Sequence, residues 1–103
     1  MKKQGKIVIT GNFNILHPGH IRLFIAAKKI ADHLTVGLIS DRLSGDAAFI
    51  EESLRFEALQ NNNLVDEVEI VTNSIEKFIL SKKPDFVMKG KEHENEFNIE
   101  LIL

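Results

Sequence analysis

The sequence contains no cysteine, tryptophan or tyrosine, and it contains only two prolines. The lack of cysteine excludes disulfide bonds and thiolate metal sites, and it fits a reducing compartment. Because tryptophan and tyrosine are also absent, only phenylalanine and histidine could stack on a nucleotide base. No apolar run approaches the roughly 20 residues of a membrane-spanning helix, and the first residues lack the apolar core of a signal peptide. We expect a cytoplasmic protein without membrane contact.

The sequence also lacks an excess of either charge. It has 13 lysines and arginines against 15 aspartates and glutamates, which gives a formal net charge of −2. Nucleic-acid binding generally requires a basic excess that displaces counterions, so we expect no nucleic-acid partner. A bound phosphate would have to be held by a few local groups. The 103 residues are enough for one small domain with a single core.

The hydrophobic pattern alternates between strands and helices. Strands are expected at residues 6–10, 34–39, 65–71 and 85–88, and helices at 18–32, 51–60 and 74–82. This order predicts an α/β, Rossmann-like three-layer domain with a mostly parallel sheet in the order 3-2-1-4. The first two strands are continuously apolar and should be central, whereas residues 65–71 alternate with acidic residues and should lie at an edge.

Two further expectations concern the middle of the chain. Residues 40–50 show no periodicity, and we expect a loop of about ten residues there, a length that is often functional. In the helix at 51–60, we expect Leu54, Ala58 and Phe56 to face the core.

The ten residues from Gly11 to His20 join the first expected strand to the first expected helix. Gly11 allows the backbone to approach a ligand closely, and the amides and dipole of the helix start favour an anion. His17 and His20 add two imidazoles that titrate near neutral pH. The stretch therefore predicts a polyphosphate site, and its histidine pair favours transfer chemistry over storage.

The same residues are also compatible with simpler roles. The two histidines could be surface residues, and a zinc site is less favoured because no third ligand lies at a convincing spacing. Asn14 either contacts a ligand or hydrogen-bonds its own turn. Arg55 either pairs with Glu51 or Glu52 on its helix or binds a phosphate.

The stretch Gly-Asn-Phe-Asn-Ile-Leu-His-Pro-Gly-His is similar to the Gly-x-Phe-Asp-x-x-His-x-Gly-His signature of the cytidylyltransferase-like nucleotidyltransferases. Further segments resemble the family in the same order, over residues 5–98. The nearest groups are glycerol-3-phosphate cytidylyltransferase and the adenylyltransferase domain of ADP-heptose synthase. Such enzymes look like Rossmann-type domains that join a nucleoside triphosphate to a phosphorylated alcohol or sugar and release pyrophosphate.

The resemblance implies a set of site residues. His17 and His20 would contact the triphosphate and stabilise the transition state. The carboxyl end of the fourth strand, where open α/β sheets bind ligands, would add Lys89 and Gly90. The full implied nucleotide-binding set is Gly11, Asn12, Phe13, Asn14, Gly19, Lys89 and Gly90, and the implied substrate or phosphate contacts are Asp41, Arg42 and Arg55.

The resemblance also implies ligands and partners. A nucleoside triphosphate and a phosphorylated small molecule would bind, and no metal-binding residues are predicted because Mg²⁺ would be held mainly through the nucleotide. A homodimer is expected, since relatives are often dimers. The apolar residues 99–103 are expected to form a docked helical turn; the alternatives are a chain fragment or an interface-forming subunit.

Three features depart from the family pattern. Asn14 replaces the signature aspartate, and the segment after Asp41 carries only Arg42 as a cation, where the family has a lysine. Residues 1–103 also resemble the family domain without its last strand and Ser/Thr-rich motif. Two hypotheses follow: a nucleotidyltransferase that uses CTP or ATP and a polyol or sugar phosphate, or a non-catalytic nucleotide-binding or dimerisation module.

Overall fold

The computed structural model describes residues 5–16 and 18–89. Its centre is a parallel sheet of four strands in the order β3-β2-β1-β4. The strands span Lys6–Gly11 (β1), His33–Ile39 (β2), Glu67–Val71 (β3) and Phe86–Lys89 (β4). The predicted Rossmann-like topology and strand order are therefore confirmed, with strand bounds that differ by one or two residues.

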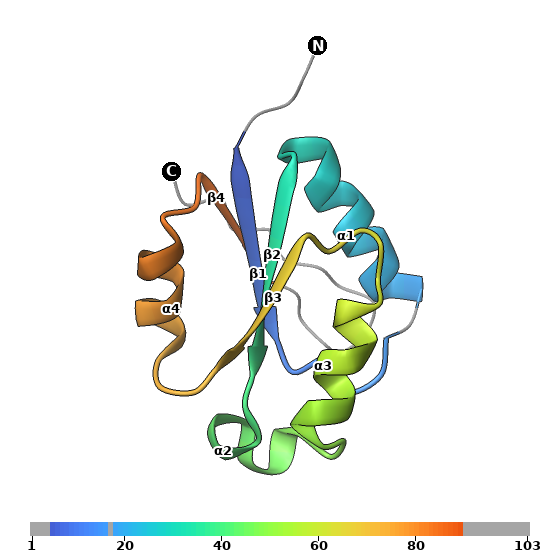
Figure 1. The fold of residues 1–103 in the computed structure, drawn as a ribbon, viewed down its shortest axis with the longest axis vertical. Coiled ribbons are helices and arrows are strands. Elements are labelled where there is room, and N and C mark those ends of the chain that lie inside the picture. The colour runs from blue at the N-terminus through green and yellow to red at the C-terminus, as the bar shows by residue number, and fades with distance from the viewer. Residues whose placement is uncertain (1–4, 17, 90–103) are drawn as a thin grey trace.

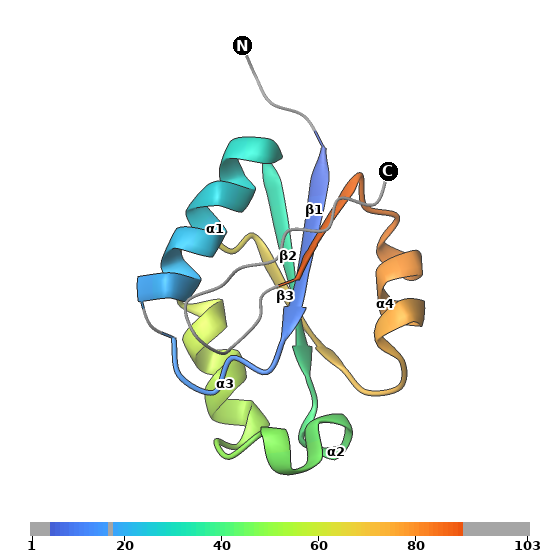
Figure 2. The same ribbon diagram turned by 180° about the vertical axis from the view of Figure 1, so that it is seen from behind.

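Helices cover both faces of the sheet and make three layers (Figure 1). Helices α1 (Pro18–Ile30) and α3 (Glu52–Gln60) lie on one face, and α4 (Ile75–Lys82) lies on the other, as the reverse view in Figure 2 also shows. The short helix α2 (Asp41–Ser44) and the 3₁₀ turn η1 (Gly45–Ala47) follow the carboxyl end of β2. The end of the sheet where ligands bind in open α/β folds thus carries α2.

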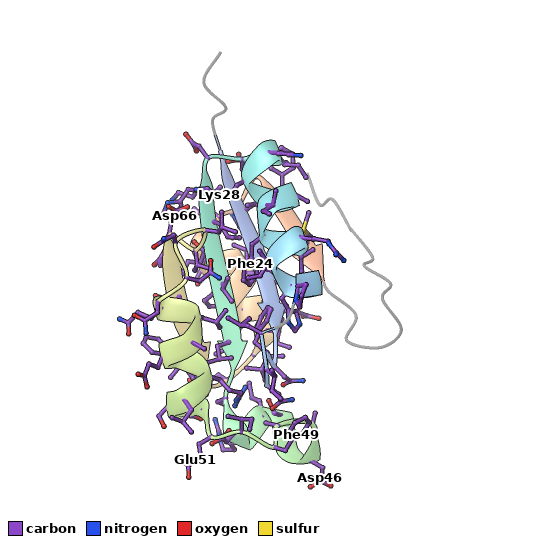
Figure 3. All side chains as sticks on the ribbon, turned by 90° about the vertical axis from the view of Figure 1, so that its right-hand side faces the viewer. Phe24, Lys28, Asp46, Phe49, Glu51 and Asp66 are labelled. Atoms are coloured by element: carbon purple, nitrogen blue, oxygen red, sulfur yellow. The ribbon has the colours of Figure 1, made fainter. Side chains whose placement is uncertain are left out.

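The main core lies between the sheet and the α1 side. The buried side chains of α1 are His20, Leu23, Phe24 and Ala27, which recur at helical spacing and pack on the apolar centres of β1 and β2. Phe24 is fully buried between α1 and the sheet (Figure 3). On the opposite face, Gly37 of β2 makes room for Phe78 of α4, since a Cβ at Gly37 would lie 2.5 Å from the Phe78 ring.

Strand β3 lies at the edge of the sheet, as predicted, and charged contacts fasten its acidic side chains. The ammonium group of Lys82 on α4 lies 2.9 Å from a carboxylate oxygen of Glu67 and 2.8 Å from one of Glu69. Hydrogen bonds, that from Lys82 foremost, hold the pKa of Glu67 below its ordinary value. Before β3, Asp66 accepts a hydrogen bond from Lys28 of α1 and one from the Leu34 backbone (Figure 3).

The prediction of a loop at residues 40–50 was wrong, because α2 and η1 occupy most of this segment. Ser40 caps the start of α2, and its hydroxyl accepts a hydrogen bond from the Leu43 amide at 3.2 Å. A single helical turn is too short to show a hydrophobic period. The Ser40 cap stabilises this turn, and a hydrophobic period does not reveal such a cap.

The predicted inner face of α3 was wrong as well. Leu54 is 55% exposed and Ala58 is also exposed, whereas Arg55 and Leu59 are the buried residues of this helix. Phe56 packs in part against the core, as expected. Compared with the predicted orientation, α3 turns Arg55 toward the interior, where its guanidinium group has hydrogen-bond partners. A hydrophobicity pattern does not reveal such partners.

Some expectations are not tested by this structure. The expected helical turn at residues 99–103, Gly90 and His17 lie outside the described residues, and the homodimer stays a prediction. In the part of the chain that is described, no helix combines the length and apolar character that crossing a membrane requires.

Candidate active site

The loop that follows β1 is folded tightly around the ring of Phe13. This residue has φ 47°, in the left-handed region that non-glycine residues seldom adopt, and its side chain is only 3% exposed. The ring packs edge-on against His20 at 5.3 Å between ring centroids and lies 5.9 Å from Phe24. Backbone strain of about 1–3 kcal/mol is commonly found at functional sites, where the surrounding packing maintains it.

Gly11 allows this arrangement. A Cβ atom at Gly11 would lie 3.0 Å from Cε2 of Phe13, so a side chain there would force the ring to move. The glycine predicted to admit a ligand thus also has a packing role, and the side chain of Phe13, a residue of the predicted nucleotide-binding set, is buried in the core. The buried Phe13 ring thus packs between the loop backbone and His20.

His20 lies in the first turn of α1 and is 6% exposed. Pro18 and Gly19 precede it in the same turn. The helix dipole favours an anion at this end of α1. Strand β4 ends next to the same loop, because Lys89 pairs with Thr10 of β1. The loop between β1 and α1 therefore begins beside the carboxyl end of β4.

Arg55 is the most heavily bonded side chain of the site. Its Nε donates to the Ile50 carbonyl at 2.8 Å, and its Nη1 donates to the carbonyls of Asn12 at 2.7 Å and Ile39 at 2.8 Å. Its Nη2 donates to Oδ1 of Asp41 at 2.6 Å. With no exposed side-chain surface, Arg55 joins the ends of β1 and β2 to the start of α2 and of α3.

Neither interpretation of Arg55 from the sequence matches this geometry. Its ion-pair partner is Asp41, whereas Glu51 and Glu52 do not pair with it, and its guanidinium group is enclosed by carbonyls where a phosphate contact was expected. Asp41 is fixed further by a reciprocal pair with Glu52, in which each backbone amide donates to the other side chain at 2.9 and 3.2 Å. Hydrogen bonds from Arg55, and then from the Glu52 backbone, hold the pKa of Asp41 below its ordinary value.

Asn14 also contacts a distant segment, whereas the sequence suggested a ligand or its own turn. Its Oδ1 accepts hydrogen bonds from the amides of Phe49 at 3.0 Å and Ile50 at 3.4 Å. Its Nδ2 donates to the Ala47 carbonyl at 2.9 Å. The signature loop is thereby attached to the segment between η1 and α3.

A pocket of about 280 Å³ opens beside this network at the carboxyl ends of the strands. Its lining is Asn12, Ile39, Leu43, Ser44, Ala47, Asn73 and Ile75. The Ser44 hydroxyl donates to Oδ1 of Asn12. Arg42, the predicted phosphate cation, donates to the Thr72 carbonyl and does not line the pocket. Sequence reasoning missed Ser44 and Asn73, because neither belongs to a motif.

Most of the predicted site residues fall into three groups, and Gly19 in α1 and Arg42 in α2 stand apart from them. Asn12, Asn14, Asp41 and Arg55 are brought together in one hydrogen-bonded frame beyond the end of β1, next to Gly11. Phe13 and His20 pack beneath it. His17, Gly90 and the Lys89 side chain lie outside what the structure describes. Among the described residues, no three or more histidines, cysteines, aspartates or glutamates are grouped so that they could hold a metal ion.

Comparison with known proteins agrees with the family resemblance of the signature loop. A family model described as cytidylyltransferase-like matches residues 8–103, nearly the whole chain. The chain belongs to the cytidylyltransferase-like family. The Gly11–His20 loop of this family member is thus the signature that the sequence indicated.

Curated relatives of this cytidylyltransferase-like protein carry two names. An FAD synthase of Picrophilus torridus is 38% identical over 101 residues, which are 92% of this chain and 72% of the relative. A bifunctional protein HldE of Helicobacter pylori strain J99 is 39% identical over 101 residues, which are 91% of this chain. The chain spans only 22% of that HldE protein and 19% of the one from Bradyrhizobium sp..

A solved structure agrees with the fold. The lipopolysaccharide core biosynthesis protein of Thermoplasma volcanium superposes with a TM-score of 0.74 at 27% identity, covering 80% of this chain and 70% of that one. Together with the family membership, these relationships support nucleotidyl transfer as the general class of activity for this cytidylyltransferase-like protein.

Proposed function

We propose that the protein transfers a nucleotidyl group from ATP or CTP to a phosphorylated polyol or sugar and releases pyrophosphate. The observation that carries the proposal is the signature loop itself. It follows β1 and places His20 in the first turn of α1, where the helix dipole favours a phosphate. The FAD synthase and HldE relatives support the same class of reaction.

In this reaction an oxygen of the acceptor phosphate attacks the α-phosphorus in line. The new P–O bond forms as the bond to the pyrophosphate oxygen breaks, and the pyrophosphate leaves with the electron pair. The protein contributes positioning and charge stabilisation, and no covalent enzyme intermediate is needed. His17 and His20 contact the triphosphate, and Mg²⁺ bound through the nucleotide would neutralise negative charge on it.

The pocket beside the frame provides a place for the acceptor. It adjoins the signature loop through Asn12, and its lining among the described residues carries amides, a hydroxyl and aliphatic groups but no charged side chain. Such a lining suits the uncharged body of an acceptor. Asp41 and Arg55 act here by holding the loop backbone in place.

The test is a matrix of pyrophosphate-release assays on the full product of the natural gene. ATP and CTP are each paired with glycerol 3-phosphate, several sugar phosphates and flavin mononucleotide, since the adenylyl derivative of flavin mononucleotide is FAD. The proposal predicts stoichiometric pyrophosphate and a new diphosphate signal in ³¹P NMR for at least one pair. It is wrong if no pair gives release.

A second candidate is a non-catalytic nucleotide-binding or dimerisation module. Two observations favour it: Asn14 stands where the signature has aspartate, and Arg42, the cation of the 41–50 segment, donates to the Thr72 carbonyl. The same assays distinguish the candidates. The module predicts nucleotide binding that His17→Ala weakens, with no pyrophosphate release for any pair.

A further inference from the structure

The segment from Ala47 to Ile50, called the 47–50 segment below, forms a wall of the site with little support from its own side chains. Ala47 lines the pocket, and Phe49 is 73% exposed, at the outer end of the molecule near α2 (Figure 3). Hydrogen bonds to its backbone therefore decide its position. Within the described part of the chain, the amides of Phe49 and Ile50 find their partner in Asn14, which is 35 and 36 residues away.

The chemistry of these contacts requires an amide. Oδ1 of Asn14 accepts from two backbone amides, and Nδ2 donates to the Ala47 carbonyl at 2.9 Å. A carboxylate has only acceptor oxygens, so an aspartate could keep the two accepted bonds but would set a negative oxygen against the Ala47 carbonyl. The departure from the signature aspartate thus has a structural counterpart in this chain.

We propose that Asn14 is a positioning residue that sets the wall of the acceptor pocket by clamping the 47–50 segment to the signature loop. Arg55 also holds Ile50, the last residue of the segment, through its carbonyl at 2.8 Å. The segment is fixed at both ends, and Ala47 is held where it lines the pocket. The part of this inference that concerns the acceptor rests on the proposed function.

The first test needs no turnover. Hydrogen exchange of the Phe49 and Ile50 amides is followed by NMR in the wild-type protein and in Asn14→Ala. Loss of the accepted bonds is expected to speed exchange at both amides by about tenfold or more. Unchanged exchange in a folded Asn14→Ala protein would overturn the clamp.

The second test uses Asn14→Asp, which restores the family residue. The matched control is Asn62→Asp, because Oδ1 of Asn62 also accepts from a backbone amide, that of Leu64 at 2.9 Å, and no donation by its Nδ2 is seen among the described residues. We expect Asn14→Asp to raise the KM for the acceptor about tenfold while kcat and the Kd for the nucleotide stay within about twofold. Asn62→Asp is expected to match the wild type in all three.

The two proposals fail in different ways. If nucleotidyl transfer is the wrong function, the wild-type protein is inactive with every substrate pair, yet exchange at the Phe49 and Ile50 amides still accelerates in Asn14→Ala. If the clamp is wrong, the wild-type protein is active but the Asn14→Asp variant has the wild-type acceptor KM or a lower one. A fall in kcat with an unchanged acceptor KM would also overturn the clamp.

Discussion

Replacing Arg55 with methionine removes the donor group of the frame while keeping much of its aliphatic volume. Three carbonyls, those of Asn12, Ile39 and Ile50, lose the guanidinium group that faces them. Each unsatisfied buried group costs about 1–3 kcal/mol. The carboxylate of Asp41 is half-exposed, so water compensates much of its loss.

We therefore expect Arg55→Met, which leaves three carbonyls without their donor, to lower the free energy of unfolding by about 3–5 kcal/mol, a large share of the about 5–15 kcal/mol typical of a domain. Arg55→Lys keeps the charge but lacks the planar fork that serves several carbonyls, so it is expected to lose about half as much. The network makes Arg55 a larger contributor to stability than a charged helix residue usually is.

The assay is urea unfolding followed by far-ultraviolet circular dichroism, because the sequence has no tryptophan or tyrosine to report by fluorescence. Arg22→Met on the exposed face of α1 is the matched control and should change stability by no more than about 0.5 kcal/mol. An Arg55→Met variant that is within about 1 kcal/mol of the wild type, with an unchanged m-value, would refute the reasoning.

Two further predictions concern the sheet and the acid limit of stability. Gly37→Ala would place a Cβ 2.5 Å from the Phe78 ring, so we expect a loss of about 1–3 kcal/mol, visible as a lower Tm; an unchanged Tm would contradict the close packing. Because the pKa of Asp41 is lowered by its hydrogen bond from Arg55, its contribution to stability is full above the ordinary value of 3.8 and is lost as the pH falls below it. Asp41→Asn should flatten this acid limb in a series of urea midpoints measured against pH, and an unaltered limb would show that the pair does not couple to folding.

The strands and their order could be predicted because their signal is local. Each central strand is a continuous apolar run, and the alternation of Val68 and Ile70 with Glu67 and Glu69 marks an edge. The start of α4 could also be predicted, because Ser74 lies directly before an apolar helical pattern. Its hydroxyl accepts a hydrogen bond from the Lys77 amide at 3.2 Å. In such segments, neighbours in the sequence determine the structure.

The frame of the site could not be predicted, because its contacts join residues far apart in the chain. Arg55 meets the Asn12 carbonyl across 43 residues, and Asn14 meets Ala47 across 33. Hydrophobicity assigns an arginine to the surface, which is why the inner face of α3 was assigned wrongly. The signature named the loop correctly, but which of its side chains face a ligand and which support the fold depends on the tertiary structure.

The central claim, that the Gly11–His20 loop performs nucleotidyl transfer, is tested most directly by the initial rate of pyrophosphate release in His20→Asn. The control is His33→Asn at the start of β2, which lies at the opposite end of the sheet from the loop. With the best substrate pair, we expect kcat/KM to fall about a hundredfold in His20→Asn and to stay within about twofold in His33→Asn. A folded His20→Asn protein that releases pyrophosphate at the wild-type rate would contradict the account.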